Sequence, residues 1–458
     1  MSDSVQAAFG LFDDDSDEEE QSFVAPPAPL QNHAAPVVKL VEQLKLAAPT
    51  APLSSSSQRV SSTRALYPAW EDVRPKFVGP IELVSECAHI GGGRGYVATE
   101  DLEPGTLVLM EKVYVPWPSD VDQSDPRFFI ATMEAILDRT DYQDVMAHLA
   151  HLHPQRLEDL PEEVLQAGRE KYGEPLEQLR QRFASLGVTH DQLLQNVFGM
   201  QCNAFDSGVF LFNAMFNHDC NPNCVKFTPE ESDAGVSEVR VAKKIRKGEP
   251  LSISYLYPRE QSRGKRLKNL REQFGFVCTC ALCVRGDSIL PKPQSTESSA
   301  DMPVIDIEEV EKVVASAEEL LKSTGDGAQV LSIALEALSD ALEIVAHDHV
   351  VLIRIHKLVA DCCDEILKSR PSQDVREYAI LFLRSSYELL ELQKMYLNDD
   401  HIDLARTLND VSQGIQLLLS LDPKVLLDEF PEWKDFRQAS FVENQYRQDY
   451  RRIKRLYE

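Results

Sequence analysis

The spacing of hydrophobic residues divides the chain into regions of different structure. From about residue 76, short apolar runs bounded by Gly and Pro indicate β-strands. Apolar residues recur at helical spacing within 125–200, and from residue 305 onward this spacing is almost continuous. The strands are expected at 81–84, 95–98, 107–110, 225–227, 239–241 and 251–255. The pattern therefore predicts an α+β region interrupted by helices and followed by an all-α region.

The N-terminal region has a different composition. Its first twenty residues carry eight acidic side chains and no basic one, and Pro, Ala and Ser dominate afterwards. Such a segment buries too little apolar surface to fold, so we expect disorder over 1–75. Within it, Val37 to Leu46 has helical spacing and is either a transient helix or a partner-binding motif. A Ser/Pro/Asp-rich stretch predicts a linker at 291–304.

The net charge of the chain limits the kinds of macromolecule that it is expected to bind. The formal net charge is −27, which argues against direct nucleic-acid binding and favours basic polypeptides. The predicted helical domain, 305–458, carries much of this bias, since residues 301–458 hold 31 acidic and 18 basic side chains, a net of −13. No run approaches eighteen apolar residues, and the N-terminus has no signal-peptide pattern. We expect a protein of the nucleus or cytoplasm, outside membranes and with reduced cysteines.

A cluster of cysteines is the first candidate site. Cys278, Cys280 and Cys283 lie within six residues, at a spacing that allows three thiolates to bind one tetrahedral zinc ion. Zinc needs a fourth ligand, and Cys220 and Cys224 are both candidates on the residues alone. The alternative is three half-buried free thiols in a turn. Crowded thiols are open to oxidation, so the zinc interpretation is favoured.

Four short motifs occur in one order along the chain. The first motif consists of Gly93-Arg94-Gly95 together with Pro104-Gly105. The second and third are the segments Asn217 to Cys224 (NHDCNPNC) and Gly248 to Tyr255 (GEPLSISY), and the fourth is the cysteine cluster. Together they resemble the catalytic core of a SET domain, which transfers methyl groups from S-adenosyl-L-methionine to lysine. The resemblance implies a SET domain at 76–290, with its helical insertion at about 114–200 and a post-SET zinc segment at 274–285. It also pairs Cys220 with Cys278, Cys280 and Cys283 around one structural zinc.

The same resemblance assigns roles to single residues. Tyr255 matches the catalytic tyrosine at the end of a strand, and it also borders the cofactor. Asn217 and His218 match the pair that holds S-adenosyl-L-methionine. Arg94 and Gly95 match the position where the chain approaches the cofactor closely.

A closer resemblance is to the SET-and-MYND (SMYD) family. Cys202-Asn203-Ala204-Phe205 is similar to a segment in which Asn203 would contact the cofactor and Phe205 would line the lysine channel. Phe276 matches an aromatic residue that packs against adenine, and Phe274 stands where the family often has tyrosine. The MYND zinc finger is not expected, because no Cys occurs between Cys87 and Cys202. The helical C-terminal region resembles the tetratricopeptide-like domain of these proteins.

The predicted fold is thus α+β, with a β-rich SET domain followed by an all-α tetratricopeptide-like domain. The predicted function is lysine methylation of a basic protein or peptide, histones included, by a monomer. The alternatives are a single non-histone substrate and a non-catalytic scaffold that binds a partner. The basic stretch 259–271 is either a solvated helix or a nuclear signal.

Overall fold

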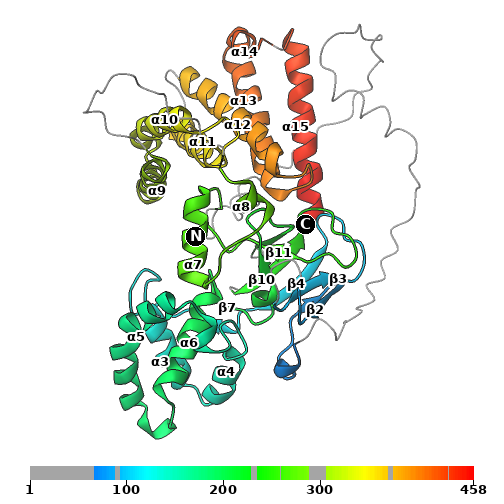
Figure 1. The fold of residues 1–458 in the computed structure, drawn as a ribbon. Coiled ribbons are helices and arrows are strands. Elements are labelled where there is room, and N and C mark those ends of the chain that lie inside the picture. Colours follow the sequence, from blue (N-terminus) through cyan, green and yellow to red (C-terminus); the bar gives the residue numbers. More distant parts are fainter. Residues whose placement is uncertain are drawn as a thin grey trace.

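The computed structural model describes residues 67–87, 93–227, 235–257, 259–287, 306–369, 375–431 and 433–458. The predicted disorder within 1–66, the segment Val37 to Leu46 and the linker at 291–304 lie outside these residues. Figure 1 shows the strands in the middle of the molecule, with helices α3–α6 gathered on one side and α9–α15 on the other. Helices α7 and α8 lie between the two groups.

Four antiparallel strands form the largest sheet. Strand β10 is buried along most of its length and is flanked by β4 and β9. Val239 lies opposite Leu109 in the register, and both side chains are buried. The order across the sheet is β1 (Phe77–Val78), β4 (Leu107–Lys112), β10 (Val236–Val241) and β9 (Cys224–Phe227).

The remaining strands form small sheets around the large one. Strands β2 (Ile81–Val84) and β3 (Gly95–Ala98) make an antiparallel hairpin. A second small sheet has the order β5 (Val115–Pro116), β7 (Gly208–Val209) and β6 (Ala204–Phe205). Strands β8 (Asn217–His218) and β11 (Ser252–Ile253) pair in parallel.

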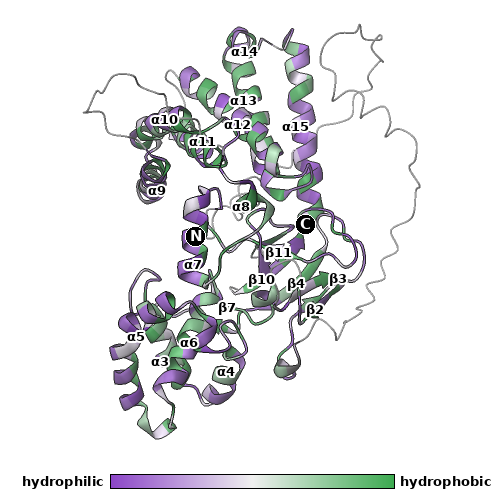
Figure 2. Cartoon of the chain, viewed as in Figure 1, coloured by the Kyte–Doolittle hydropathy of each residue, from purple (hydrophilic) through white to green (hydrophobic). Residues whose placement is uncertain are grey.

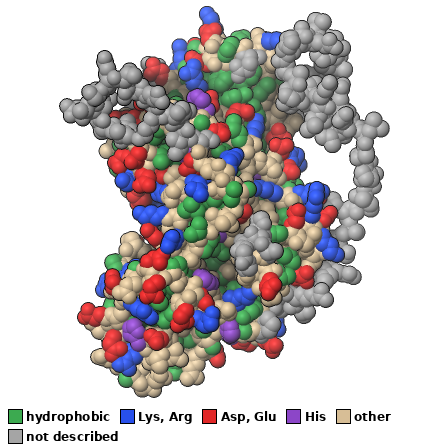
Figure 3. Space-filling view, in the orientation of Figure 1, with side chains coloured by type: hydrophobic (Ala, Val, Ile, Leu, Met, Phe, Trp, Pro, Cys, Tyr) green, Lys and Arg blue, Asp and Glu red, His purple; other side chains and the backbone are tan. Residues whose placement is uncertain are grey.

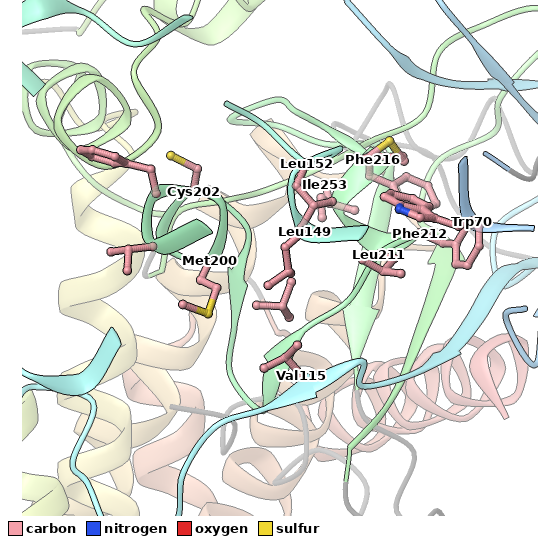
Figure 4. Packing of buried hydrophobic residues seen from close by; sticks show 14 of the residues in the cluster. Trp70, Val115, Leu149, Leu152, Met200, Cys202, Leu211, Phe212, Phe216 and Ile253 are labelled. Carbon is pink, nitrogen blue, oxygen red and sulfur yellow. The ribbon is translucent and has the colours of Figure 1, made fainter. Parts of the chain in front are cut away.

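The helical insertion shares a hydrophobic core with the strands. Figure 4 shows Leu149, Leu152 and Met200 from the insertion on the same core as Val115 and Ile253. Because this core is continuous, the insertion holds the strands in place rather than standing apart from them. Its helices are α3 (Phe128–Leu137), α4 (Tyr142–Leu149), α5 (Glu162–Arg182) and α6 (His190–Cys202). The short 3₁₀ turns of this half are η2 (Pro68–Trp70), η4 (Leu157–Asp159), η5 (Ala184–Leu186) and η6 (Asn213–Met215).

The C-terminal half is helical throughout the part that is described. Consecutive helices pack on one another from α9 to α13, and α15 packs against α13. Each carries hydrophobic and hydrophilic residues (Figure 2), and the hydrophobic ones form two cores. The helices are α7 (Arg263–Phe274), α8 (Ala281–Arg285), α9 (Ile307–Thr324), α10 (Gly327–Ile344), α11 (Val351–Ser369), α12 (Arg376–Tyr396), α13 (Ile402–Leu421), α14 (Pro423–Glu429) and α15 (Phe436–Tyr457).

Polar contacts join the C-terminal helices to the segment around Cys220. The side-chain amide of Asn221 donates to the carbonyl of Tyr396 at 3.0 Å, and Lys243 Nζ donates to the Asn221 carbonyl at 2.8 Å. Arg259 forms an ion pair with Asp403 near the start of α13. The helical domain is therefore bonded directly to a predicted motif.

The α+β class, the strands and the helical C-terminal region are confirmed, with one correction to an element boundary. Strand β11 ends at Ile253, so Tyr255 follows the strand instead of ending it. No helix in the described parts of the chain combines the length and apolar character needed to cross a bilayer.

Candidate active site and cysteine cluster

The parallel pair β8–β11 brings two distant motifs together. Asn217 lies opposite Ser252, and His218 lies opposite Ile253. The backbone N–H of Tyr255 donates to Nδ1 of His218 at 3.0 Å. Short strands therefore place the predicted cofactor pair beside the predicted catalytic tyrosine.

Tyr255 is held at both its backbone and its hydroxyl. The hydroxyl donates to the carbonyl of Phe216 at 2.6 Å, which orients the phenol toward the residue just before β8. Burial, more than the nearby Cys202 thiol, raises the pKa of Tyr255 above its usual value of 10.0. The side chain thus stays uncharged at neutral pH and retains oxygen lone pairs that can accept a further hydrogen bond.

Arg94, Gly95 and Asn217 form one close contact. The side-chain amide of Asn217 donates to the Arg94 carbonyl at 2.9 Å. A Cβ atom at Gly95 would lie 2.1 Å from Nδ2 of Asn217, so only glycine fits this position. The Arg94 guanidinium lies over the Tyr67 ring, and its Nη2 donates to the His151 carbonyl at 2.7 Å. Its Nη1 is buried without a partner and can donate to a ligand.

Asn203 directs its side chain toward the insertion. It follows α6, and its Nδ2 donates to the carbonyls of His153 at 2.6 Å and Gly199 at 2.7 Å. Its amide nitrogen is therefore occupied, which leaves Oδ1 to meet a ligand. The segment after α4 accepts from both Arg94 and Asn203. His151 and His153 act here through their backbone carbonyls, a role that their side chains do not reveal in the sequence.

Two of the three predicted phenylalanines surround Tyr255. The Phe274 ring lies 5.0 Å from the Tyr255 ring, measured between centroids, and the Phe276 ring lies 6.2 Å from it. Phe276 also lies 6.0 Å from the imidazole of His218. Phe205 lies on β6, where its ring packs edge-on against Phe210 with the Lys226 ammonium 5.2 Å from its centroid. The structure thus groups Phe274 and Phe276 with Tyr255.

The structure gathers Cys220, Cys278, Cys280 and Cys283. Their sulfur atoms all lie within 4.8 Å of one another. Cys220 Sγ is 3.9 Å from Cys278 Sγ and 3.5 Å from Cys283 Sγ. A zinc ion with Zn–S bonds of about 2.3 Å in a tetrahedron requires sulfur atoms about 3.8 Å apart. The four thiols therefore fit zinc, whereas Cys224, the other candidate, is buried on β9.

Two polar residues connect this cluster to its surroundings. Arg266 is fully buried on α7, with Nη2 3.9 Å from Cys283 Sγ, where its positive charge favours thiolates. This corrects the expectation of a wholly solvated helix in the basic stretch. His218 Nε2 lies 3.2 Å from Cys220 Sγ, while burial lowers the His218 pKa to about 4. With Nδ1 accepting from Tyr255, the hydrogen bonds assign the neutral ring's proton to Nε2, which points at the cluster.

Glu111 is a buried residue that the sequence analysis missed. Its carboxylate accepts from the backbone N–H groups of Leu211, Phe212 and Asn213 at 2.8–3.1 Å. These amides precede β8, so Glu111 holds the segment that leads to Asn217. An acidic residue inside the apolar run of β4 was the signal that could have revealed it.

Comparison with known proteins agrees with this geometry. Residues 93–256 match the SET domain family. The chain is 37% identical over 99 residues to the protein-lysine N-trimethyltransferase SMYD5 of Homo sapiens, covering 20% of this chain and 23% of that protein. It is 34% identical over 99 residues to the histone-lysine N-methyltransferase SET5 of Meyerozyma guilliermondii, covering 20% of each chain. It is 28% identical over 199 residues to the histone-lysine N-methyltransferase SMYD1 of Homo sapiens, covering 37% of this chain and 39% of that protein.

These matches to relatives span between a fifth and two fifths of the relatives' lengths. The region that matches the SET domain family contains both β8 and β11. The motifs, the parallel pairing of β8 with β11 and the sequence matches agree with one another. Residues 93–256 therefore form a SET domain, and the chain is similar in sequence to lysine methyltransferases of the SMYD and SET5 kinds.

Proposed function

We propose that the protein transfers a methyl group from S-adenosyl-L-methionine to the side-chain amine of a lysine in another protein. The observation that carries this proposal is the placement of Tyr255 against His218, Phe274 and Phe276, next to the contact between Arg94 and Asn217. These residues come from four separate segments of the chain, and all are polar or aromatic groups of the type that methyl transfer to an amine requires.

The residues present fit the cofactor. The unpartnered Nη1 of Arg94 suits a carboxylate such as that of a methionyl group. Gly95 lets the backbone approach a ligand closely, while Asn203 Oδ1 and the half-buried Phe276 ring suit a ribose and an adenine. When bound, S-adenosyl-L-methionine supplies an activated methyl group on a sulfonium ion.

The chemistry that remains for the protein is to present a neutral amine. A free lysine has a pKa near 10.4, so deprotonation at pH 7 costs about 4–5 kcal/mol. The aromatic rings around Tyr255 exclude water and lower the pKa of an amine placed there. The uncharged Tyr255 hydroxyl, oriented by its bond to the Phe216 carbonyl, can then accept from that amine and align it.

The four cysteines hold a structural zinc in this proposal. Zinc bound there would tie the segment of Phe274 and Phe276 to the loop after β8, and thereby close the site around Tyr255. No step of methyl transfer needs the metal.

The substrate is a basic protein, and histones are the first to test. The net charge of −13 over 301–458 supports this choice, as do the names of the histone-modifying relatives. We further propose a tetratricopeptide-like C-terminal domain, the lack of a MYND finger, a monomeric state and a nuclear or cytoplasmic location. A non-catalytic scaffold is the second candidate, because the contacts of Asn221 and Arg259 couple the helical domain to the site.

The test is Tyr255→Phe, assayed with labelled cofactor on histones and on a whole-cell lysate. We expect turnover below a tenth of the wild-type value and nearly unchanged cofactor affinity, because the hydroxyl acts on the amine. Tyr257→Phe is the matched control: this tyrosine is two residues away and 61% exposed, so its substitution should leave turnover unchanged.

Retention of more than a tenth of the turnover in Tyr255→Phe corresponds to a loss under about 1.4 kcal/mol and would remove the catalytic assignment. Cofactor binding without methylation of any protein in the lysate would favour the scaffold.

A further inference from the structure

Helix α15 carries a basic groove in an acidic protein. Gln448, Arg451, Arg452 and Arg455 line it, and their spacing places them on one face of the helix. All four are exposed. Figure 3 shows Lys and Arg side chains gathered beside the lower part of α15. We call these four residues the arginine groove.

Two of its arginines have their charge available. Arg452 is paired with Asp400 and Asp449. Arg451 and Arg455 form no hydrogen bond or ion pair with any residue in the described ranges. Side by side on one turn, they offer two guanidinium groups, each able to bind a carboxylate in a bidentate manner.

The groove stands on a rigid base. The hydroxyl of Tyr457 donates to the Asp400 carbonyl at 3.2 Å, and its ring lies 6.3 Å from that of Phe227. A Cβ at Gly105 would lie 2.0 Å from the Leu456 carbonyl oxygen, so the end of α15 is pressed against the turn before β4. The backbone that carries the groove is therefore held in place.

A simpler role for these cations is to stabilise the negative end of the helix dipole. That effect falls off within the last turn. Arg455 lies in the last turn of α15, but Arg451 lies before it. The dipole therefore accounts for part of the groove and leaves Arg451 unexplained.

The same chain contains a segment of the opposite charge. Residues 13–20 read Asp-Asp-Asp-Ser-Asp-Glu-Glu-Glu, seven carboxylates in eight residues. The chain between residue 20 and residue 67 can extend by about 150 Å at about 3.3 Å per residue. This is well over the width of a folded chain of this size, whose radius of gyration is about 21 Å.

The acidic segment 13–20 is a better candidate ligand for the arginine groove than a free polyanion, because it is tethered to the same chain. A net charge of −27 repels nucleic acid over long range, whereas a tethered segment has no diffusional encounter to make. Its effective concentration near the groove is about millimolar. We propose that the acidic segment 13–20 binds the arginine groove of α15 within the same chain.

The test uses the full chain and a labelled peptide of residues 11–22. In the neutralised chain, the seven carboxylates are replaced by the corresponding amides (Asp13, Asp14, Asp15 and Asp17 to Asn; Glu18, Glu19 and Glu20 to Gln). The peptide should bind the neutralised chain about fivefold or more tightly than the wild type, because the wild-type segment competes from its tether. Adding Arg451→Glu and Arg455→Glu to the neutralised chain should weaken binding at least tenfold.

Arg437→Glu is the matched control, because Arg437 is exposed on the other end of α15 and should not affect binding. A peptide with amides in place of its carboxylates should not bind. Equal binding to the wild-type and neutralised chains would overturn the proposal, as would binding that survives both arginine substitutions. A 20-base-pair DNA duplex that displaces the peptide at 0.15 M salt and binds more tightly would assign the groove to nucleic acid instead.

Discussion

Glu111 should determine how stably the segment before β8 is held. In Glu111→Gln, one side-chain oxygen can still accept from two of the three backbone amides, but the new NH₂ group faces the third. That amide loses its acceptor and meets a donor. Because Glu111 is only 3% exposed, water cannot compensate, and an unsatisfied buried donor costs about 1–3 kcal/mol. The segment Leu211 to Asn213 should therefore open more often in the variant.

The contribution of Glu111 to the opening free energy of this segment should decrease as the pH rises. Burial raises the pKa of Glu111 from 4.5 to about 7, against the lowering effect of the three amides. A raised pKa means that the folded segment retains a proton that the open segment releases. This contribution to stability is complete below about pH 4.5 and is lost as the pH rises through 7. At about 1.36 kcal/mol per pKa unit, the wild type loses about 2–3 kcal/mol between pH 5 and pH 8.

The glutamine cannot titrate, so it lacks this contribution. The opening free energy of the wild type relative to Glu111→Gln should fall by about 2–3 kcal/mol from pH 5 to pH 8. This fall is as large as the cost of the substitution, so at pH 8 the variant should open no more often than the wild type. Hydrogen exchange measured by mass spectrometry on the peptide containing Leu211 to Asn213 gives this free energy locally. Glu238→Gln is the control, since Glu238 is buried on the adjacent strand and bonds to Arg240, not to these amides. A difference that grows toward pH 8 would show that the amides outweigh burial, and would refute the reasoning.

Three further predictions concern metal, product and salt. Elemental analysis should find one zinc per chain, and Cys280→Ser should lower both zinc content and activity; full activity without metal, or two zincs, would contradict this. The wild type should accumulate di- or trimethyl-lysine, and Phe274→Tyr should shift the product toward monomethyl-lysine, because a hydroxyl on this ring, whose centroid lies 5.0 Å from that of Tyr255, could hold the amine. The products are identified by mass spectrometry after the reaction has run to completion. If the wild type and Phe274→Tyr both make only monomethyl-lysine, Phe274 serves only in packing. The Michaelis constant for a Lys/Arg-rich peptide should rise from 0.1 M to 1 M salt, as the Debye length falls from about 10 Å to about 3 Å, whereas a constant value would exclude electrostatic steering.

Spacing in the sequence predicted those parts of the site that are local. Three cysteines within six residues must lie close together, and the resemblance to SET proteins added Cys220, which the structure places beside them. The strands were also predictable, because the short apolar runs and the Gly and Pro residues that bound them are local features of the sequence. Tyr255 was expected to end a strand, but β11 stops two residues earlier, since pairing with the two-residue β8 limits its length.

The partners of buried polar groups could not be predicted. The guanidinium of Arg94 and the amide of Asn203 donate to the carbonyls of His151 and His153, and a carbonyl has no residue type to recognise. Glu111 escaped notice for the same reason, since it binds backbone amides. Arg266 was expected in solvent because it lies in a basic stretch, yet proximity to the cysteines places it in the interior.

The parallel pairing of β8 with β11 determines when the site can form during synthesis of the chain. Parallel strands cannot be joined by a tight turn, and here the connection runs through β9 and β10 before β11 can pair. Asn217 and His218 can therefore pair only after Ser252 and Ile253 have emerged from the ribosome. The four-cysteine cluster can form only after Cys283 has also emerged. Closing such long loops costs entropy before any contact compensates for it, so the site should be among the last parts to form. A chain that ends before residue 283 would lack the complete site, and the proposed methyl transfer would be confined to molecules whose synthesis has passed that residue.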